Sequence, residues 1–165
     1  MRFLEAMAAR SNGGGTMAGC MLFMGGMSGS GSSQQHCILA IDDEETFLAF
    51  LTEVLECYGY RVITASSGDE AIQIYEERWR EIDMVLLDFF LPPLTGEFVF
   101  DELQRVNPDV RVVLVTGYEK PVPFAMFQKG LLGSLKKPCS LGDLVQKVED
   151  VIDTPAVSPT SPSAA

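Results

Sequence analysis

The sequence predicts an α/β domain in which helices cover both faces of a five-stranded parallel sheet. Between residues 37 and 153, five short apolar runs alternate with five segments of helical periodicity. The runs at residues 37–41 and 84–87 are apolar throughout, as in strands that are buried on both faces, and each connection is long enough for a crossover helix. Right-handed crossovers of this kind give a doubly wound domain.

The first half of this region contains three predicted strands and two helices. The strands are expected at residues 37–41, 61–64 and 84–87. Apolar residues at helical spacing lie between them: Phe47, Leu51, Val54, Leu55 and Tyr58, then Ile72, Ile74, Tyr75 and Trp79. Gly59 suits the end of the first helix, and Ser67 with Glu70 forms a capping box for the second.

The second half contains the other two strands, at residues 110–115 and 132–135. Thr95 opens a helix that ends at Asn107-Pro108. Pro121 and Pro123 leave room for only a short fourth helix, of about residues 124–129. Ser140 and Asp143 cap a last helix, whose apolar residues are Leu144, Val145, Val148, Val151 and Ile152.

The two ends of the chain differ from this domain, which we place at residues 37–153. Residues 1–36 are rich in glycine, serine and methionine, as in a flexible segment. Residues 154–165 carry three prolines and three serines, and we expect a disordered tail.

Composition excludes several classes of function. The chain has 12 basic and 23 acidic residues and a net charge of -11, which argues against a nucleic-acid surface. No apolar run reaches the roughly 18–20 residues that a membrane span needs. The four cysteines fit no zinc or Cys-x-x-Cys pattern, so we expect reduced thiols in a cytoplasmic protein. The single histidine leaves little for a histidine-based metal site or catalytic triad.

Polar residues follow four of the five predicted strands. Asp42-Asp43 follows the first strand, Asp88 the third, Thr116 the fourth and Lys136-Lys137-Pro138 the fifth. Ligand sites of doubly wound sheets lie beyond the carboxyl ends of the strands. These side chains are therefore predicted to meet in one pocket.

Three aspartates in one pocket repel one another unless a cation neutralises them. A hard divalent cation with oxygen ligands, most plausibly Mg2+, is one neutraliser, and a lysine of the fifth strand is the other. Such a site can accept a phosphoryl group, because the metal and the lysine offset its charge and Thr116 can donate a hydrogen bond.

These residues resemble the receiver domain of two-component response regulators. The resemblance rests on Asp42-Asp43, on Asp88 with Pro92 and Gly96 in an Asp-x-x-x-Pro-x-x-x-Gly pattern, on Thr116-Gly117 and on Lys137-Pro138. It covers about residues 37–153 and is similar in detail to receivers at the C-terminus of hybrid sensor histidine kinases. It implies a flavodoxin-like strand order 2-1-3-4-5.

The resemblance also implies roles for individual residues. Asp88 would be the phosphoacceptor, and it would ligate Mg2+ together with Asp43, the backbone carbonyl of Phe90 and, directly or through water, Asp42. Lys137 would pair with a phosphoryl oxygen, and the Thr116-Gly117 pair would form the switch. The donor would be a sensor histidine kinase or a histidine phosphotransfer protein. The chain would pass the signal to an output protein or form a homodimer through the face of helix 4, strand 5 and helix 5.

Three departures from the family pattern bear on these roles. Ser134 stands where receivers have Tyr or Phe, which puts the usual readout in doubt. The segment between Thr116 and Lys137 is about one residue short and contains two prolines. Phe90 and Tyr118, two residues beyond Asp88 and Thr116, are bulky where an attacking water would approach, so we expect slow loss of the phosphoryl group.

Other functions stay open at this stage. A degenerate receiver would act as an interaction module without phosphorylation. Ser134 and the altered fourth helix favour this interpretation, and it is opposed by the intact Asp43, Asp88, Thr116 and Lys137. An aspartate-based phosphatase is disfavoured, because such enzymes place a second acid where this chain has Phe90. A helix-turn-helix DNA-binding domain has too little room after the last helix, and no ATP-binding kinase domain is present. We therefore expect no enzyme activity beyond self-phosphorylation and slow autodephosphorylation.

Overall fold

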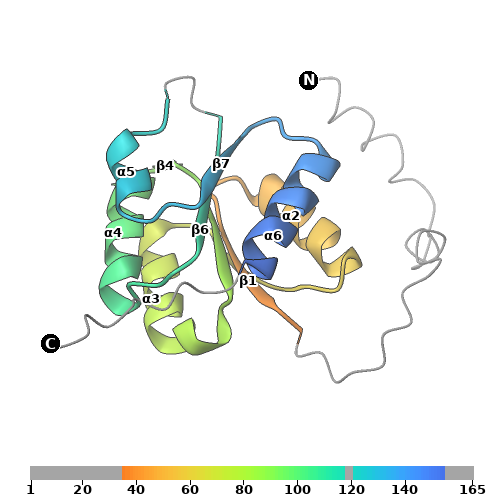
Figure 1. The fold of residues 1–165 in the computed structure, drawn as a ribbon, viewed down its shortest axis with the longest axis horizontal. Coiled ribbons are helices and arrows are strands. Elements are labelled where there is room, and N and C mark those ends of the chain that lie inside the picture. Colours follow the sequence, from red (N-terminus) through yellow and green to blue (C-terminus); the bar gives the residue numbers. More distant parts are fainter. Residues whose placement is uncertain (1–34, 118–120, 155–165) are drawn as a thin grey trace, which may run out of the picture. The chain divides into compact units, whose positions relative to one another are not determined.

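A computed structural model describes residues 35–117 and 121–154. Its elements follow the predicted order of strands and helices (Figure 1). The strands of the main sheet are β1 (Cys37–Ile41), β2 (Arg61–Ala65), β3 (Met84–Leu87), β6 (Val112–Thr116) and β7 (Gly133–Lys136). The α-helices are α2 (Glu45–Cys57), α3 (Gly68–Arg78), α4 (Gly96–Val106), α5 (Phe124–Gln128) and α6 (Leu141–Asp153).

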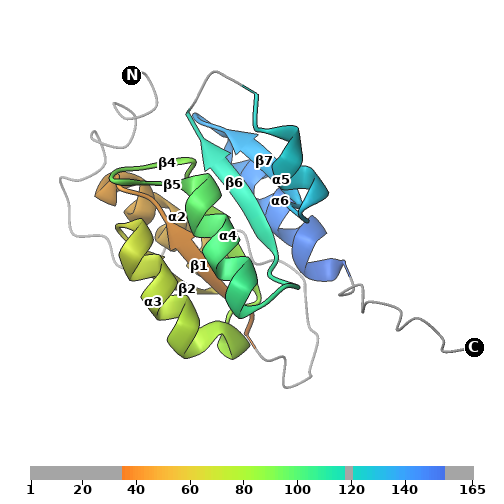
Figure 2. The ribbon, with the colours of Figure 1, turned by 90° about the vertical axis from the view of Figure 1, so that its left-hand side faces the viewer.

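The five strands form one parallel sheet in the order β2-β1-β3-β6-β7. This order is the predicted 2-1-3-4-5 order, so the predicted fold class is confirmed. The helices α3, α4 and α5 cover one face, and α2 and α6 cover the other (Figures 1 and 2). The strand order therefore reverses direction between β1 and β3. In doubly wound sheets, ligands bind at this point, beyond the carboxyl ends of the strands.

A separate apolar core fills each side of the sheet. All five residues of β1 are buried, with Leu39 in the core under α3 and α4 and Ile38 in the core under α2 and α6. Successive side chains of a strand point to opposite faces, so a strand at the centre of the sheet must be apolar at every position. This requirement explains why β1 reads as an unbroken apolar run.

Three helices begin with the side-chain caps that the sequence indicates. Ser67, Thr95 and Ser140 each accept a hydrogen bond from the backbone N–H three residues later, at 3.1–3.3 Å. Such caps satisfy one of the unpaired N–H groups at a helix start. They fix where α3, α4 and α6 leave the sheet.

Several details differ from expectation. The fourth strand in chain order of the main sheet, β6, spans residues 112–116 rather than 110–115, so Thr116 is its last residue and does not follow it. The second helix ends at Arg78, and Trp79 instead begins a short 3-10 helix, η1 (Trp79–Glu81). A two-stranded antiparallel ribbon of β4 (Phe90–Leu91) and β5 (Leu94–Thr95) follows β3, because a turn at Pro92-Pro93 brings these short segments together. Cys37 and Cys139 are free thiols as expected, whereas Cys57 is disulfide-bonded.

Among the described residues, no helix is both long and apolar enough to span a membrane.

Gly96 allows the start of α4 to pack against the loop that follows β3. Its N–H donates to the carbonyl of Phe89 at 2.8 Å, and an added Cβ would lie 2.7 Å from the Phe89 Cα. Because backbone atoms cannot turn aside as a side chain can, we expect Gly96→Ala to lower the free energy of unfolding by about 1–3 kcal/mol. Urea unfolding measures this change.

Gly142→Ala is the matched control, since Gly142 also lies in the first turn of a helix and its added Cβ meets only the Ser140 Oγ, at 3.8 Å. A loss of stability in this control as large as that of Gly96→Ala would contradict the explanation.

Candidate functional site

The carboxyl ends of β1, β3, β6 and β7 bring the predicted polar residues to one edge of the sheet. Ile41 pairs with Leu87 in the sheet register, so Asp42 and Asp88 both follow directly from neighbouring strand ends. Asp88 extends this pairing, because its N–H donates to the carbonyl of Ile41 at 2.9 Å. The Lys137 N–H likewise donates to the Thr116 carbonyl at 2.9 Å.

Asp42, Asp43 and Asp88 form one carboxylate cluster. Each offers an oxygen, and these oxygens all lie within 4.8 Å of one another. Asp42 and Asp88 are buried, at 1% and 7% exposure, while Asp43 is exposed. The cluster is therefore anchored in the sheet edge and open to solvent on the side of Asp43.

Lys137 is the cation of this cluster. Its ammonium bonds to Oδ2 of Asp42 and, at 2.7 Å, to Oδ2 of Asp88. Its side chain is only 17% exposed, whereas the neighbouring Lys136 is exposed. Of the two lysines at the end of the last strand, Lys137 is thus the one that the structure brings to the aspartates.

The two buried aspartates are held in the same way. The other oxygen of Asp42 accepts from the N–H of Glu44, and that of Asp88 accepts from the N–H of Phe90, both at 3.0 Å. Each carboxylate thus has one oxygen on the backbone two residues ahead and one on Lys137. This fixes both carboxylates with an oxygen facing the shared ammonium.

Burial dominates the electrostatics of Asp42. Desolvation raises the pKa of its carboxyl above the ordinary value of 3.8, although the hydrogen bonds from Lys137 and from the Glu44 N–H oppose the shift. For Lys137, burial lowers the pKa, but the hydrogen bonds to Asp42 and Asp88 and their charges outweigh it, so the pKa is raised. The lysine is therefore charged at neutral pH, and ionised Asp42 costs folding energy.

The cluster has the chemistry of a Mg2+ site. Its ligands are hard carboxylate oxygens that converge within 4.8 Å, and a single ammonium does not balance three carboxylates. Hard divalent cations prefer such oxygen donors. The site residues of this chain therefore fit the metal that the sequence predicts.

The other predicted site residues lie around this cluster. Thr116 is buried at the end of β6, and Gly117 follows it, with an added Cβ 3.8 Å from the Cβ of Lys137. The Phe90 side chain is 64% exposed next to Asp88, and Ser134 is exposed on β7. Tyr118 lies outside the described residues.

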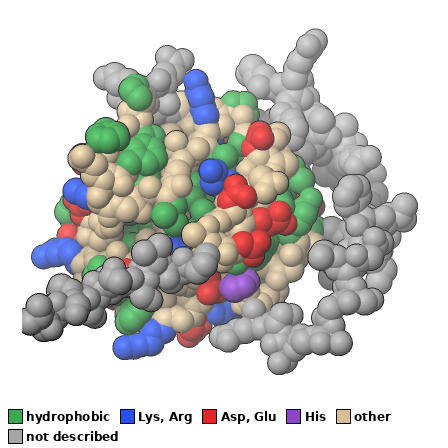
Figure 3. All heavy atoms as spheres, in the orientation of Figure 1, with side chains coloured by type: hydrophobic (Ala, Val, Ile, Leu, Met, Phe, Trp, Pro, Cys, Tyr) green, Lys and Arg blue, Asp and Glu red, His purple; other side chains and the backbone are tan. Residues whose placement is uncertain are grey.

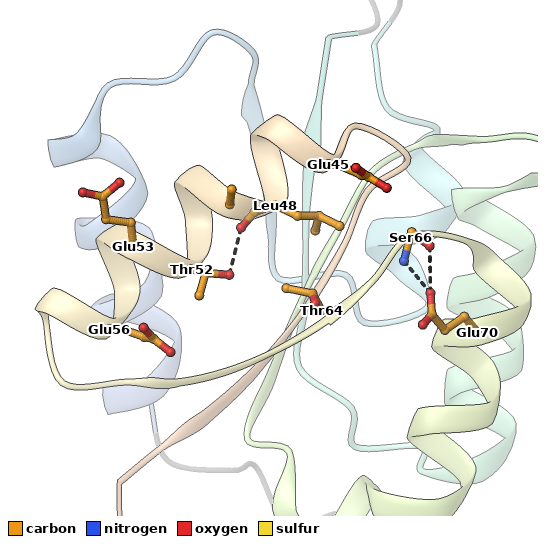
Figure 4. Close-up of a pocket in the computed structure, with 9 residues that line it drawn as sticks. Glu45, Leu48, Thr52, Glu53, Glu56, Thr64, Ser66 and Glu70 are labelled. Atoms are coloured by element: carbon orange, nitrogen blue, oxygen red, sulfur yellow. Dashed lines mark hydrogen bonds between the residues drawn. The ribbon is translucent and has the colours of Figure 1, made fainter. Parts of the chain in front are cut away.

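A second hollow, of about 590 Å3, lies between α2, β2 and the start of α3 (Figure 4). Its glutamates include Glu45, Glu56 and Glu70, and Glu70 accepts hydrogen bonds from both the N–H and the hydroxyl of Ser66. None of the aspartates of the cluster lines it. It is thus a separate acidic groove, which the sequence did not indicate.

The raised pKa of Asp42 leads to a prediction for stability. Between pH 3.8 and the higher pKa of the folded state, the folded protein binds more protons than the unfolded chain, so stability falls as pH rises. An asparagine side chain carries no charge, so the Asp42→Asn variant escapes this loss. In metal-free buffer we expect Asp42→Asn to unfold at higher urea concentration than wild type at pH 7, with a difference that shrinks toward pH 4.

Asp109→Asn, at an exposed loop position, is the control and should show no such growing difference. A variant at Asp42 that is less stable than wild type at pH 7, or a difference independent of pH, would contradict the electrostatic explanation.

Comparison with curated proteins identifies relatives of this region. The family model of the response regulator receiver domain matches residues 38–149. The sensor kinase CckA of Brucella abortus is 31% identical over 121 residues, which cover 70% of this chain and 12% of that protein. The transcriptional regulatory protein GlrR of Escherichia coli K12 is 30% identical over 120 residues, which cover 72% of this chain and 27% of GlrR. The chain thus spans only a small part of these relatives.

Solved structures show the same fold over the same region. A receiver domain protein from Clostridium thermocellum has a TM-score of 0.67 and 32% identity, covering 71% of this chain and 94% of that one. A chain of the CheX-CheY-BeF3-Mg2+ complex from Borrelia burgdorferi has a TM-score of 0.68 and 25% identity, covering 72% of this chain and 90% of that one. With its strand order and matched residues, the chain belongs to the response regulator receiver domain family of two-component systems.

Proposed function

We propose that this receiver takes a phosphoryl group from a phosphohistidine onto Asp88 and signals through the change that follows. The observation that carries the proposal is Lys137, which bonds to both buried aspartates of the cluster. An ammonium in this place can pair with a phosphoryl oxygen as soon as Asp88 carries one. The donor would be a sensor histidine kinase or a phosphotransfer protein, in keeping with the similarity to the sensor kinase CckA.

Asp42, Asp43, Asp88 and the backbone carbonyl of Phe90 would hold Mg2+. When bound, the ion supplies positive charge that offsets the repulsion between the Asp88 carboxylate and the phosphoryl oxygens. The similar CheY structure is described as a complex with BeF3 and Mg2+, which supports the same chemistry for this chain.

The transfer exchanges one bond to phosphorus for another. A carboxylate oxygen of Asp88 forms a P–O bond while the P–N bond of the donor breaks. The electron pair stays on the imidazole nitrogen, and Asp88 becomes an acyl phosphate. Lys137 turns from the carboxylate to a phosphoryl oxygen, and the Thr116 hydroxyl donates to another. The chain thus modifies itself and turns over no separate substrate.

The readout we propose uses the face of α5, β7 and α6. Hydrophobic side chains are exposed over α5 (Figure 3), where Phe124 and Phe127 are 73% and 39% exposed. The helix has only five residues, and Ser134 of β7 offers no aromatic ring to move with Thr116. An output protein or a second copy of this chain would therefore contact this face, and α5 would respond to the phosphoryl group in place of an aromatic switch.

The direct test is phosphorylation by a small donor. With Mg2+ and acetyl phosphate, wild-type protein should gain the mass of one phosphoryl group, which hydroxylamine removes because it cleaves acyl phosphates. Asp88→Asn should gain none. Asp101→Asn removes a half-exposed carboxylate that pairs with Lys129 outside the aspartate cluster, and it should behave as wild type. If wild type shows neither this gain nor a spectral change with beryllofluoride, the proposal fails and an interaction module that needs no phosphorylation takes its place.

Phe90 sets a further expectation, slow loss of the phosphoryl group. Its exposed ring lies beside Asp88 and offers no polar group that could orient a water molecule. Phe90→Asn should shorten the half-life of the phosphorylated protein severalfold, as followed by intact mass over time. Phe98→Asn removes an exposed phenylalanine of α4 and should leave the half-life near that of wild type; an equal effect of both substitutions would refute the role of Phe90.

A further inference from the structure

The ammonium of Lys137 has a third neighbour besides the two aspartates. It lies over the ring of Phe47, with Nζ 4.2 Å from the ring centroid. A cation at this distance is attracted by the negative face of an aromatic ring. Because the Lys137 side chain is only 17% exposed, water weakens this attraction little.

The ring is held in place from behind. Phe47 belongs to the first turn of α2, and its N–H donates to the Glu44 carbonyl at 3.0 Å. Its side chain packs against the core under α2 and α6, and its ring contacts that of Phe50, with 5.9 Å between centroids. The Phe47 ring is thus held in a fixed position beside Lys137, whose aliphatic side chain is flexible.

We propose that Phe47 is a positioning residue for Lys137 during phosphoryl transfer, an inference that rests on the function proposed above. During the transfer, the ammonium must exchange an Asp88 oxygen for a phosphoryl oxygen. A hydrogen bond to one oxygen is lost in this exchange, but attraction to the ring face does not depend on which oxygen the ammonium bonds. Phe47 therefore keeps the ammonium at the site, and shielded from water, while its partner changes.

This role differs from simple packing in one measurable way. Packing depends on the size of the ring, whereas attraction to a cation depends on the negative charge of the ring face. Fluorine substitution withdraws that charge and changes the size little. Phenylalanine with one, two and three ring fluorines at position 47 therefore separates the two roles.

The experiment measures the rate of Asp88 phosphorylation by acetyl phosphate in Mg2+ buffer. We expect the rate to fall stepwise with each added fluorine, and Phe47→Leu to lower it about two- to tenfold, the range of a cation–π contact. Phe47→Tyr keeps the ring face and should restore most of the rate. The apparent affinity for beryllofluoride should follow the same order.

Trifluorophenylalanine at Phe50 is the matched control, because Phe50 lies on the same helix and contacts the Phe47 ring, whereas the ring under the Lys137 ammonium is that of Phe47. It should leave the rate unchanged. The positioning role is overturned if wild type is phosphorylated but the phosphorylation rate does not change with added fluorines at Phe47. It is also overturned if fluorination of Phe50 lowers the rate as much as fluorination of Phe47. In both cases the proposed function stands. If wild type takes no phosphoryl group, the proposed function fails and this role with it.

Discussion

The contact of one ammonium with two buried carboxylates governs this site. Lys137 reaches Asp42 and Asp88 at the edge of the sheet, while Asp43 adds a third carboxylate on the solvent side. When all three aspartates are ionised, one lysine leaves two negative charges unbalanced. Such a cluster is costly inside a protein unless a further positive charge joins it, and two unbalanced negative charges favour the binding of a divalent cation.

The fold itself brings Lys137 to the two aspartates. Parallel strands end at one edge, so residues 49 and 95 positions from Lys137 reach it without any long loop. The backbone N–H groups two residues beyond each buried aspartate then fix the carboxylates, and Gly96 lets α4 close over the loop of Asp88. The apolar cores on both sides of the sheet carry the stability that the charged edge lacks.

The sequence predicted more of this arrangement than its single motifs suggest. An apolar strand followed by a polar residue predicts both the strand and the place of the residue, so the meeting of Asp42, Asp88 and Lys137 could be foreseen. The ribbon of β4 and β5 could not be predicted from the sequence, because two-residue strands show no periodicity. The contact between the Phe47 ring and the Lys137 ammonium could not be predicted either. Helical spacing indicates an apolar face of a helix, but not which aromatic ring on it contacts a cation. The spacing of Trp79 predicts an α-helix, whereas the structure has a 3-10 helix there, because apolar spacing does not separate an α-helix from one turn of 3-10 helix.

The dependence of the free energy of unfolding on Mg2+ concentration tests most directly whether the aspartate cluster takes up a further positive charge. Above the Kd for Mg2+, each tenfold increase in Mg2+ concentration should raise the free energy of unfolding by about 1.4 kcal/mol at 25 °C. Asp43→Asn should lose most of this gain, and Asp109→Asn should keep it. Urea unfolding of the wild-type protein that is the same at every Mg2+ concentration would show that the carboxylate cluster binds no Mg2+.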